Sequence, residues 1–263
     1  MNLRSFCSEN GIGYRELVID DGLINKVYEL SFPPDKRGLL LGVPDGCIDV
    51  QVVDTNSEEK DFVAGSYLQG RRSAASDYEW CFGIKFVPGL EYSFSKIEAP
   101  ALLDTRLEAG SLFDIDALQD IAHLPLDFET RARLAAEYFG VENRDDFFHK
   151  SDVLVAFITK AIFDSGGIIR IEDIVERTGY SHRYVASQFK GVVGCTMKTF
   201  ANIIRIQNAI KLLSDERYRC MTGLDIGTGL GYFDQSHFDK QFKKHTTLTP
   251  SEVRSGSASM LFM

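Results

Sequence analysis

The 263-residue sequence has few cysteines, a single tryptophan and no long apolar segment. Its five cysteines are scattered and form no C-x-x-C pair, which argues against a disulfide framework and a zinc site. No apolar run approaches the ~18 residues of a membrane-spanning helix, and the first residues lack the apolar segment of a signal peptide. We therefore expect a cytoplasmic protein with no metal, no cofactor and no membrane partner.

Basic residues are also scarce, because 29 Lys and Arg stand against 38 Asp and Glu, a net charge of −9. The imbalance is uneven along the chain. Residues 1–150 hold 15 basic and 27 acidic residues, whereas 151–263 hold 14 and 11. An acidic part joined to a mildly basic part indicates two domains with different partners.

Short apolar runs between turn residues characterise the first part of the chain. Pro44-Asp45-Gly46 and Pro88-Gly89 are examples of the turns that bound them. Regularly spaced short strands are typical of a β-barrel or a sandwich. The strands that we expect cover residues 23–30, 39–43, 47–53, 62–64 and 82–87.

The apolar spacing becomes helical near residue 111, and three helices are expected before Gly166-Gly167 interrupts the pattern. These helices could form a dimer seam or pack against the strand-rich domain. Their spacing leaves both arrangements open.

An internal repeat follows Gly167. Asp173-Ile174 and Gly179-Tyr180, with four residues between them, recur 52 residues later as Asp225-Ile226 and Gly231-Tyr232. Three further positions recur at an offset of 53, so that Val185, Phe189 and Lys190 correspond to Phe238, Phe242 and Lys243. The second copy therefore has one extra residue in its turn.

Each copy has the pattern of a helix-turn-helix. A first helix, over 171–178 or 222–230, ends at a glycine that tolerates the left-handed conformation. Ser181 or Asp234 then caps a second helix. We expect the aromatic residue after each glycine, Tyr180 or Tyr232, to anchor the turn in the core.

The second helix of each copy has a narrow apolar face, formed by residues four apart, and a polar outer face. Short polar, amide and basic side chains suit the base edges of the DNA major groove. The expected base contacts are His182, Arg183, Ala186, Ser187, Gln235, Ser236, His237 and Lys240. The expected phosphate contacts are Lys190, Lys243 and Lys244. A single polar helix face of this kind is more often an ordinary solvent-exposed surface. Two copies in register favour DNA binding instead.

Arg183 is suited to guanine and Gln235 to adenine. An amphipathic helix over 196–214, roughly 27 Å long, separates the two copies. This length is close to the ~34 Å rise of one DNA turn. We therefore expect one chain to bind a bipartite site on double-stranded DNA, in successive major grooves.

The repeat resembles the C-terminal domain of the AraC/XylS family of transcription regulators. The segments that carry the resemblance are Gly231 to Phe238, Phe242-Lys243-Lys244 and Thr249-Pro250-Ser251-Glu252-Val253-Arg254, with Gly179-Tyr180-Ser181, Phe189-Lys190, Arg205, Ala209 and Leu212-Leu213. The family also implies an N-terminal domain that senses a small-molecule effector or forms a homodimer, and RNA polymerase as a partner if the protein is an activator. The stretches 43–49 and 62–65 resemble the β-barrel sensor domain of less-studied members.

The sequence departs from the family at three positions. Val175 and Gly227 replace the alanine that usually follows the isoleucine of each first helix, and Thr247 replaces a glycine. Gly227 and Gly229 in one short helix each cost about 1 kcal/mol relative to alanine. The second head is therefore expected to be the softer one.

The expected fold is α+β with two domains: an N-terminal, cupin-like β-barrel with flanking helices and an all-α domain with two helix-turn-helix motifs joined by a long helix. The expected division is a β-rich sensor at 1–110, a helical linker or dimerisation region at 111–165, the DNA-binding domain at 166–254 and a tail at 255–263.

The sequence gives the fewest indications for the position of the effector site. Aromatic residues that could line it, although a core position is the commoner role, are Tyr67, Tyr78, Trp80, Phe82, Phe86 and Tyr92. Asp45 and Asp49 are expected at turns or on the surface, and Arg71-Arg72 in a solvated loop.

Two other functions are compatible with a helix-turn-helix module. A DNA-repair methyltransferase fused to this module would need a zinc-bound cysteine cluster, which the sequence lacks, so no enzyme is expected. The alternative function is a helix-turn-helix module with weakened DNA binding that acts mainly through protein contacts.

Overall fold

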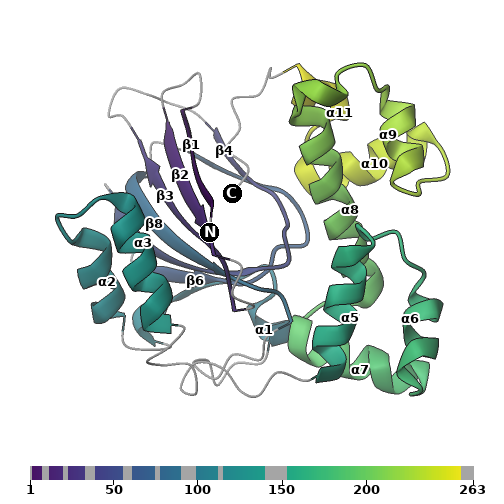
Figure 1. Cartoon of the computed structure of the whole chain (residues 1–263), viewed down its shortest axis with the longest axis horizontal. Helices are drawn as coiled ribbons and strands as arrows, with labels where there is room; N and C mark the ends of the chain where they lie inside the picture. The colour runs from purple at the N-terminus through teal and green to yellow at the C-terminus, as the bar shows by residue number, and fades with distance from the viewer. Residues whose placement is uncertain are drawn as a thin grey trace.

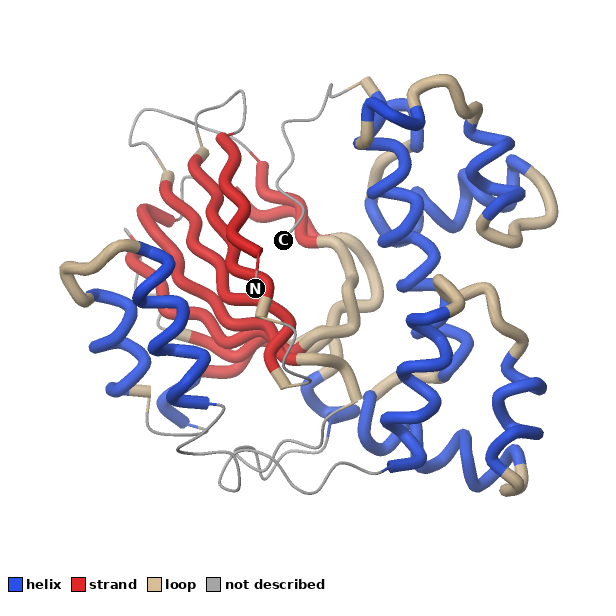
Figure 2. Tube along the Cα trace, viewed as in Figure 1, coloured by secondary structure: helices blue, strands red, loops and turns tan. Residues whose placement is uncertain are grey.

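The computed structural model describes residues 2–7, 12–19, 23–32, 39–55, 61–74, 78–89, 99–111, 115–139 and 153–255. A strand-rich N-terminal part and a helical C-terminal part lie side by side (Figures 1 and 2). This is the two-domain α+β architecture that the sequence predicts.

The N-terminal part contains one large antiparallel sheet with the strand order β1-β2-β3-β8-β5-β6-β9. Its strands are β1 (Asn2–Cys7), β2 (Gly13–Val18), β3 (Ile24–Ser31), β8 (Tyr78–Phe86), β5 (Ile48–Thr55), β6 (Phe62–Ala64) and β9 (Arg106–Glu108). Strands β4 (Leu39–Gly42) and β7 (Arg71–Ala74) form a second, two-stranded sheet. Within the described residues, the pairings leave the large sheet open between β1 and β9.

The five expected strands are present as β3, β4, β5, β6 and β8, whereas β1, β2, β7 and β9 were not predicted. Charged residues hide some of the missing strands. In β2, Glu16 is buried and accepts hydrogen bonds from Tyr14 and Lys26, so the strand does not show an apolar pattern. Strand β7 begins with Arg71 and Arg72, which read as a loop in the sequence.

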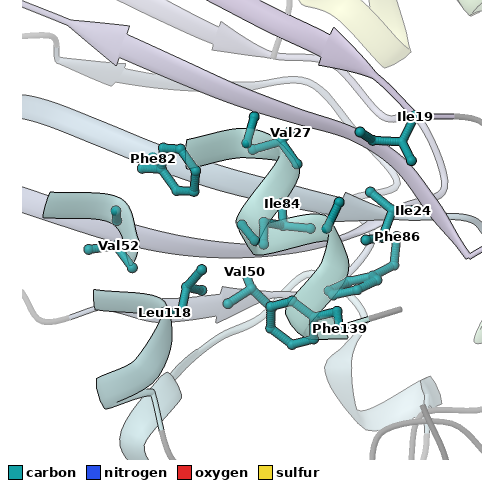
Figure 3. Close-up of a cluster of buried hydrophobic side chains, with 14 of the residues drawn as sticks. Ile19, Ile24, Val27, Val50, Val52, Phe82, Ile84, Phe86, Leu118 and Phe139 are labelled. Atoms are coloured by element: carbon teal, nitrogen blue, oxygen red, sulfur yellow. The ribbon is translucent and has the colours of Figure 1, made fainter. Parts of the chain in front are cut away.

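Helices α2 (Asp116–His123) and α3 (Phe128–Glu137) cover one face of the large sheet (Figure 1). Apolar side chains from β3, β5 and β8 meet Leu118 and Phe139 there (Figure 3). A buried ion pair joins Arg131 of α3 to Glu29 of β3, and Trp80 Nε1 donates to the same carboxylate at 2.9 Å. Leaving either charge unpaired would be costly, so this pair fixes how α3 docks.

The first two of the three helices expected between 111 and 163 therefore pack on the sheet. The third, α5 (Val153–Asp164), packs instead with the helices that follow it. Phe147 and Phe148, whose apolar spacing in the sequence fits the third expected helix, lie outside the described residues. The domain boundary at residue 166 and a dimer seam remain predictions.

Beyond residue 166 the described chain is helical up to residue 254. The elements are α6 (Ile171–Thr178), α7 (His182–Val193), α8 (Met197–Ser214), a 3-10 turn (Glu216–Tyr218), α9 (Gly223–Gly229), α10 (Gln235–Thr246) and α11 (Pro250–Arg254). Helix α8 crosses the whole helical part (Figure 1). Its N-terminal half packs with α5, α6 and α7, and its C-terminal half with α9, α10 and α11.

Candidate nucleic-acid interface

The first head consists of α6, a tight turn and α7. Helix α6 ends at Gly179, which adopts a φ of 71°, the left-handed conformation that glycine tolerates. The Ser181 side chain then accepts a hydrogen bond from Tyr184 N and caps α7. Both features were predicted from the sequence.

The second head repeats this arrangement with α9 and α10. Thr222 and Asp225 form a complete capping box at the start of α9, and Gly231 turns the chain with a φ of 77°. Asp234 caps α10 by accepting from His237 N, as predicted. Thr249 and Glu252 form the expected capping box on α11. Side-chain caps therefore fix the helix starts of the second head, although its first helix contains glycines.

The inward faces of the two recognition helices are fully buried. Val185 and Phe189 of α7, and Phe238 and Phe242 of α10, are 0% exposed. The structure places the sequence-predicted DNA contacts on the opposite faces. His182, Arg183, Ser187, Lys190, Gln235, Ser236, His237, Lys240, Lys243 and Lys244 are exposed, and Ala186 is half-buried.

Helix α8 holds the two heads apart. It has 18 residues, so at ~1.5 Å per residue it is roughly 27 Å long. Phe200 in its first half contacts the ring of Phe189, whereas Ile210 in its second half lies in the core that contains Phe238. The two heads thus have separate cores on one rigid connector.

The turn aromatics of the two heads differ. Tyr232 is buried and its ring centroid lies 5.2 Å from that of Phe238, so it anchors the second turn as predicted. The same prediction is wrong for Tyr180, which is 57% exposed and lies 5.0 Å from the Tyr184 ring. Tyr184 lies next to Arg183, three residues before Ser187 and six before Lys190, which are all expected on the outer face. This spacing in the sequence could have predicted that the Tyr184 ring lies on the outer face too.

Sequence analysis also missed Phe233. This side chain is 94% exposed and directly precedes the capping residue of α10. Tyr180, Tyr184 and Phe233 therefore present apolar surface at the N-terminal ends of both recognition helices.

Gly227 has a packing role that its helix propensity alone does not reveal. A β-carbon at Gly227 would lie 3.1 Å from Cβ of Phe238, whereas one at Gly229 would meet nothing within 4 Å. The glycine lets α9 approach α10 more closely than the alanine usual in the family. Gly227 therefore lowers the helix propensity of α9 but allows closer packing between α9 and α10.

Alanine substitutions at Gly227 and Gly229 should separate the effect of helix propensity on stability from the effect of side-chain packing. Gly229→Ala should raise the free energy of unfolding by about 0.5–1 kcal/mol, because alanine favours the helix without crowding. Gly227→Ala should raise it less, or lower it, because its methyl group crowds Phe238. Urea unfolding of the two variants measures the difference, and equal gains would rule out the packing role.

Thr247 ends α10 with a φ of 63°, although left-handed backbone costs a non-glycine residue about 1–2 kcal/mol. Arg72 of the N-terminal domain donates from Nε to Thr247 Oγ1 at 3.1 Å and from NH2 to its carbonyl oxygen at 3.3 Å. The residue that replaces the family's glycine is thus a contact point between the two domains.

The proposed effector-site aromatics have different surroundings. Phe82 and Phe86 are fully buried in the core under α2 and α3, Trp80 packs against that core, and Tyr78 is buried on the other side of the sheet. Tyr67 lines a cavity. Tyr92 lies outside the described residues.

The carboxylates expected at the surface are placed differently. Asp49 is 8% exposed and accepts hydrogen bonds from Tyr28 and Gln51, and Asp45 pairs with the buried Lys85. The prediction of a turn or surface position is wrong for Asp49, which lies within β5 and is buried by its partners, whereas Asp45 is half-buried in the turn that follows β4. Among the described residues, no group of three His, Cys, Asp or Glu is arranged to hold a metal. In the same ranges, no helix is both long and apolar enough to cross a membrane.

A family model described as a helix-turn-helix domain matches residues 174–256. The probable transcription factor PqrA of Proteus vulgaris is 34% identical over 86 residues, which cover 33% of this chain and 68% of PqrA. The lactose operon transcription activator of Staphylococcus xylosus is 30% identical over 86 residues. The match spans only 30% of that activator's length.

The comparison with solved structures matches AraT and ToxT, both at low TM-scores. The C-terminal domain of AraT, a response regulator from Geobacillus stearothermophilus, has 24% identity and a TM-score of 0.36, over 40% of this chain and 85% of that one. ToxT from Vibrio cholerae, bound to (E)-4-(8-methylnaphthalen-1-yl)but-3-enoic acid, has 14% identity and a TM-score of 0.46, over 97% and 99%. On the sequence match to PqrA and the paired helix-turn-helix heads, the chain belongs to the AraC/XylS family of transcription regulators.

Proposed function

We propose that this transcription regulator binds a bipartite DNA site with α7 and α10 in successive major grooves, and that its N-terminal domain responds to a small-molecule effector. The observation that carries the proposal is the pair of exposed polar helix faces, each backed by its own buried core and joined by α8. If the protein is an activator, RNA polymerase is its further partner. Homodimer formation belongs to the same proposal.

The direct test is selection of DNA from a random pool with the full chain, followed by footprinting. We expect two protected half-sites about 10–11 bp apart, because adjacent major grooves on one face of the duplex have this spacing. If no sequence is enriched, the alternative holds, in which a module with weakened DNA binding acts through protein contacts. The capped ends and buried core of the second head favour the DNA-binding proposal.

Arg183→Ala should relax specificity in one half-site and cost about 1–3 kcal/mol at the matching base pair, because a bidentate contact to guanine is lost. Binding titrations with every base at that position measure the effect. Lys190→Ala is the comparison, and should weaken all sequences equally and reduce the salt slope by about 1. An equally uniform loss for Arg183→Ala would make Arg183 a phosphate contact instead.

A further inference from the structure

A polar cavity lies on the side of the N-terminal domain that faces the DNA-binding heads. Its volume is about 40 Å³, and it is open to solvent at its mouth. Charged groups from four separate segments converge on it, together with one phenol: Asp45, Asp49, Tyr67, Arg71, Lys85 and Arg106. Such convergence of polar groups in a concave site is typical of binding sites for small polar molecules.

Asp49 has an oxygen without a partner in this cavity. Its Oδ2 accepts hydrogen bonds from Tyr28 and Gln51, each at 2.7 Å, but its Oδ1 is buried and accepts none. Burial raises the pKa of Asp49 above its ordinary value, although Lys85 and the hydrogen bonds from Tyr28 and Gln51 lower it. A buried acceptor of this kind is suited to a donor group supplied by a ligand.

The cations of the cavity are not all neutralised within the protein. Lys85 is paired with Asp45, and although burial lowers its pKa, the Asp45 and Asp49 carboxylates raise it above its ordinary value. Arg106 donates instead to two neutral hydroxyls, those of Tyr67 at 3.1 Å and Tyr78 at 2.9 Å. Arg71 forms a long ion pair of 3.8 Å with the half-exposed Asp104, donates to the Asp104 carbonyl oxygen and lies over the Tyr67 ring. Arg71 and Arg106 therefore form a positive wall suited to an anionic group.

We propose that the cavity binds a small carboxylic acid that also carries an amine or hydroxyl group, such as an amino acid, a hydroxy acid or a sugar acid. The carboxylate pairs with Arg71 and Arg106, and the amine or hydroxyl donates to Asp49 Oδ1. This inference rests on the proposed effector response and gives the effector a chemical class.

The segment 65–72 connects this cavity to the second head. Tyr67 and Arg71 line the cavity, whereas Leu68, Gly70 and Arg72 contact the end of α10. The His245 ring donates from Nδ1 to Leu68 O at 2.9 Å, and Arg72 binds Thr247. A β-carbon at Gly70 would lie 2.8 Å from His245 O, so the two backbones are in close contact.

The segment that follows β4, which lines the cavity beside Arg71, also contacts the heads. Gln207 of α8 donates to Pro44 O at 2.6 Å, and Val43 packs in the core of the second head. Two segments that would enclose the ligand therefore also hold the connector helix and the end of the second recognition helix. Binding in the cavity would therefore act on the two segments that contact α8 and the end of α10.

The test is calorimetric titration of the full chain with α-amino acids, lactate and gluconate, and with acetate and ethanolamine as probes that lack one of the two groups. At least one acid with both groups should bind roughly tenfold or more tightly than either partial probe. Arg71→Gln and Arg106→Gln should each weaken that acid by roughly ten- to a hundred-fold while leaving DNA binding without ligand intact.

Arg72→Gln is the matched control, because Arg72 contacts Thr247 and does not line the cavity. It should keep the acid's affinity and reduce the acid's effect on DNA affinity. The proposal is overturned if no acid with both groups binds, if acetate or ethanolamine binds as well, or if both cavity variants bind normally. A failure of DNA selection would instead contradict the proposed function and would leave these binding results valid.

Discussion

Replacing Phe238 with alanine should lower the stability of the second head by about 3–5 kcal/mol and leave the first head folded. The Phe238 side chain is fully buried, with its ring centroid 5.2 Å from that of Tyr232 and 5.6 Å from that of Phe242. Alanine leaves a cavity at the centre of this core. The first head depends on a different set of buried residues around Phe189 and Phe200.

Hydrogen exchange of the two heads and a footprint on the selected DNA measure this effect. Amides of α9 and α10 should lose protection, those of α7 should keep it, and one half-site should disappear. Phe233→Ala is the control, because this exposed side chain should change stability by less than about 0.5 kcal/mol. Equal loss of protection in both heads would show that α8 couples their folding.

The Phe238→Ala variant also gives a second measure of the contact at Gly227. Alanine at position 227 crowds Cβ, Cγ and Cδ1 of Phe238 in the native protein, and the Phe238→Ala variant lacks the last two of these atoms but keeps Cβ. The cost of Gly227→Ala should therefore be smaller in that variant. A double-mutant cycle would give this coupling energy directly.

The heads could be predicted from the sequence because their signals are local. Glycines, caps and residues four apart act within one or two helical turns, and Gly179, Ser181, Asp234 and Thr249 all have their predicted roles. Tyr180 is the exception. Its repeat partner Tyr232 contacts Phe238, whereas Val185 occupies the equivalent position in the first head and is smaller.

The cavity could not be predicted because its parts come from distant strands. Asp49 reads as a turn or surface residue until Tyr28 and Gln51 are brought to it, and Tyr28 is on another strand. Arg71 and Arg72 are adjacent in the sequence, yet one lines the cavity and the other contacts Thr247 of the second head. Adjacent side chains of a strand point to opposite faces of the sheet. Because strand β7 was not predicted, the sequence did not show that Arg71 and Arg72 have different surroundings.

Gly65→Ala should destabilise the N-terminal domain by about 3 kcal/mol or more. A β-carbon at Gly65 would lie 1.7 Å from Leu102 O, a backbone atom that cannot move aside like a flexible side chain. Leu102 ends the short helix α1 (Ala99–Leu102), which contacts α7 of the first head, so the clash would disturb both domains. Thermal unfolding measures the loss. The control is Gly110→Ala, where a β-carbon meets nothing within 4 Å and the melting temperature should not fall. Equal behaviour of the two variants would contradict the close approach of segment 65–72 to α1, and with it the contact that links the cavity wall to the first head.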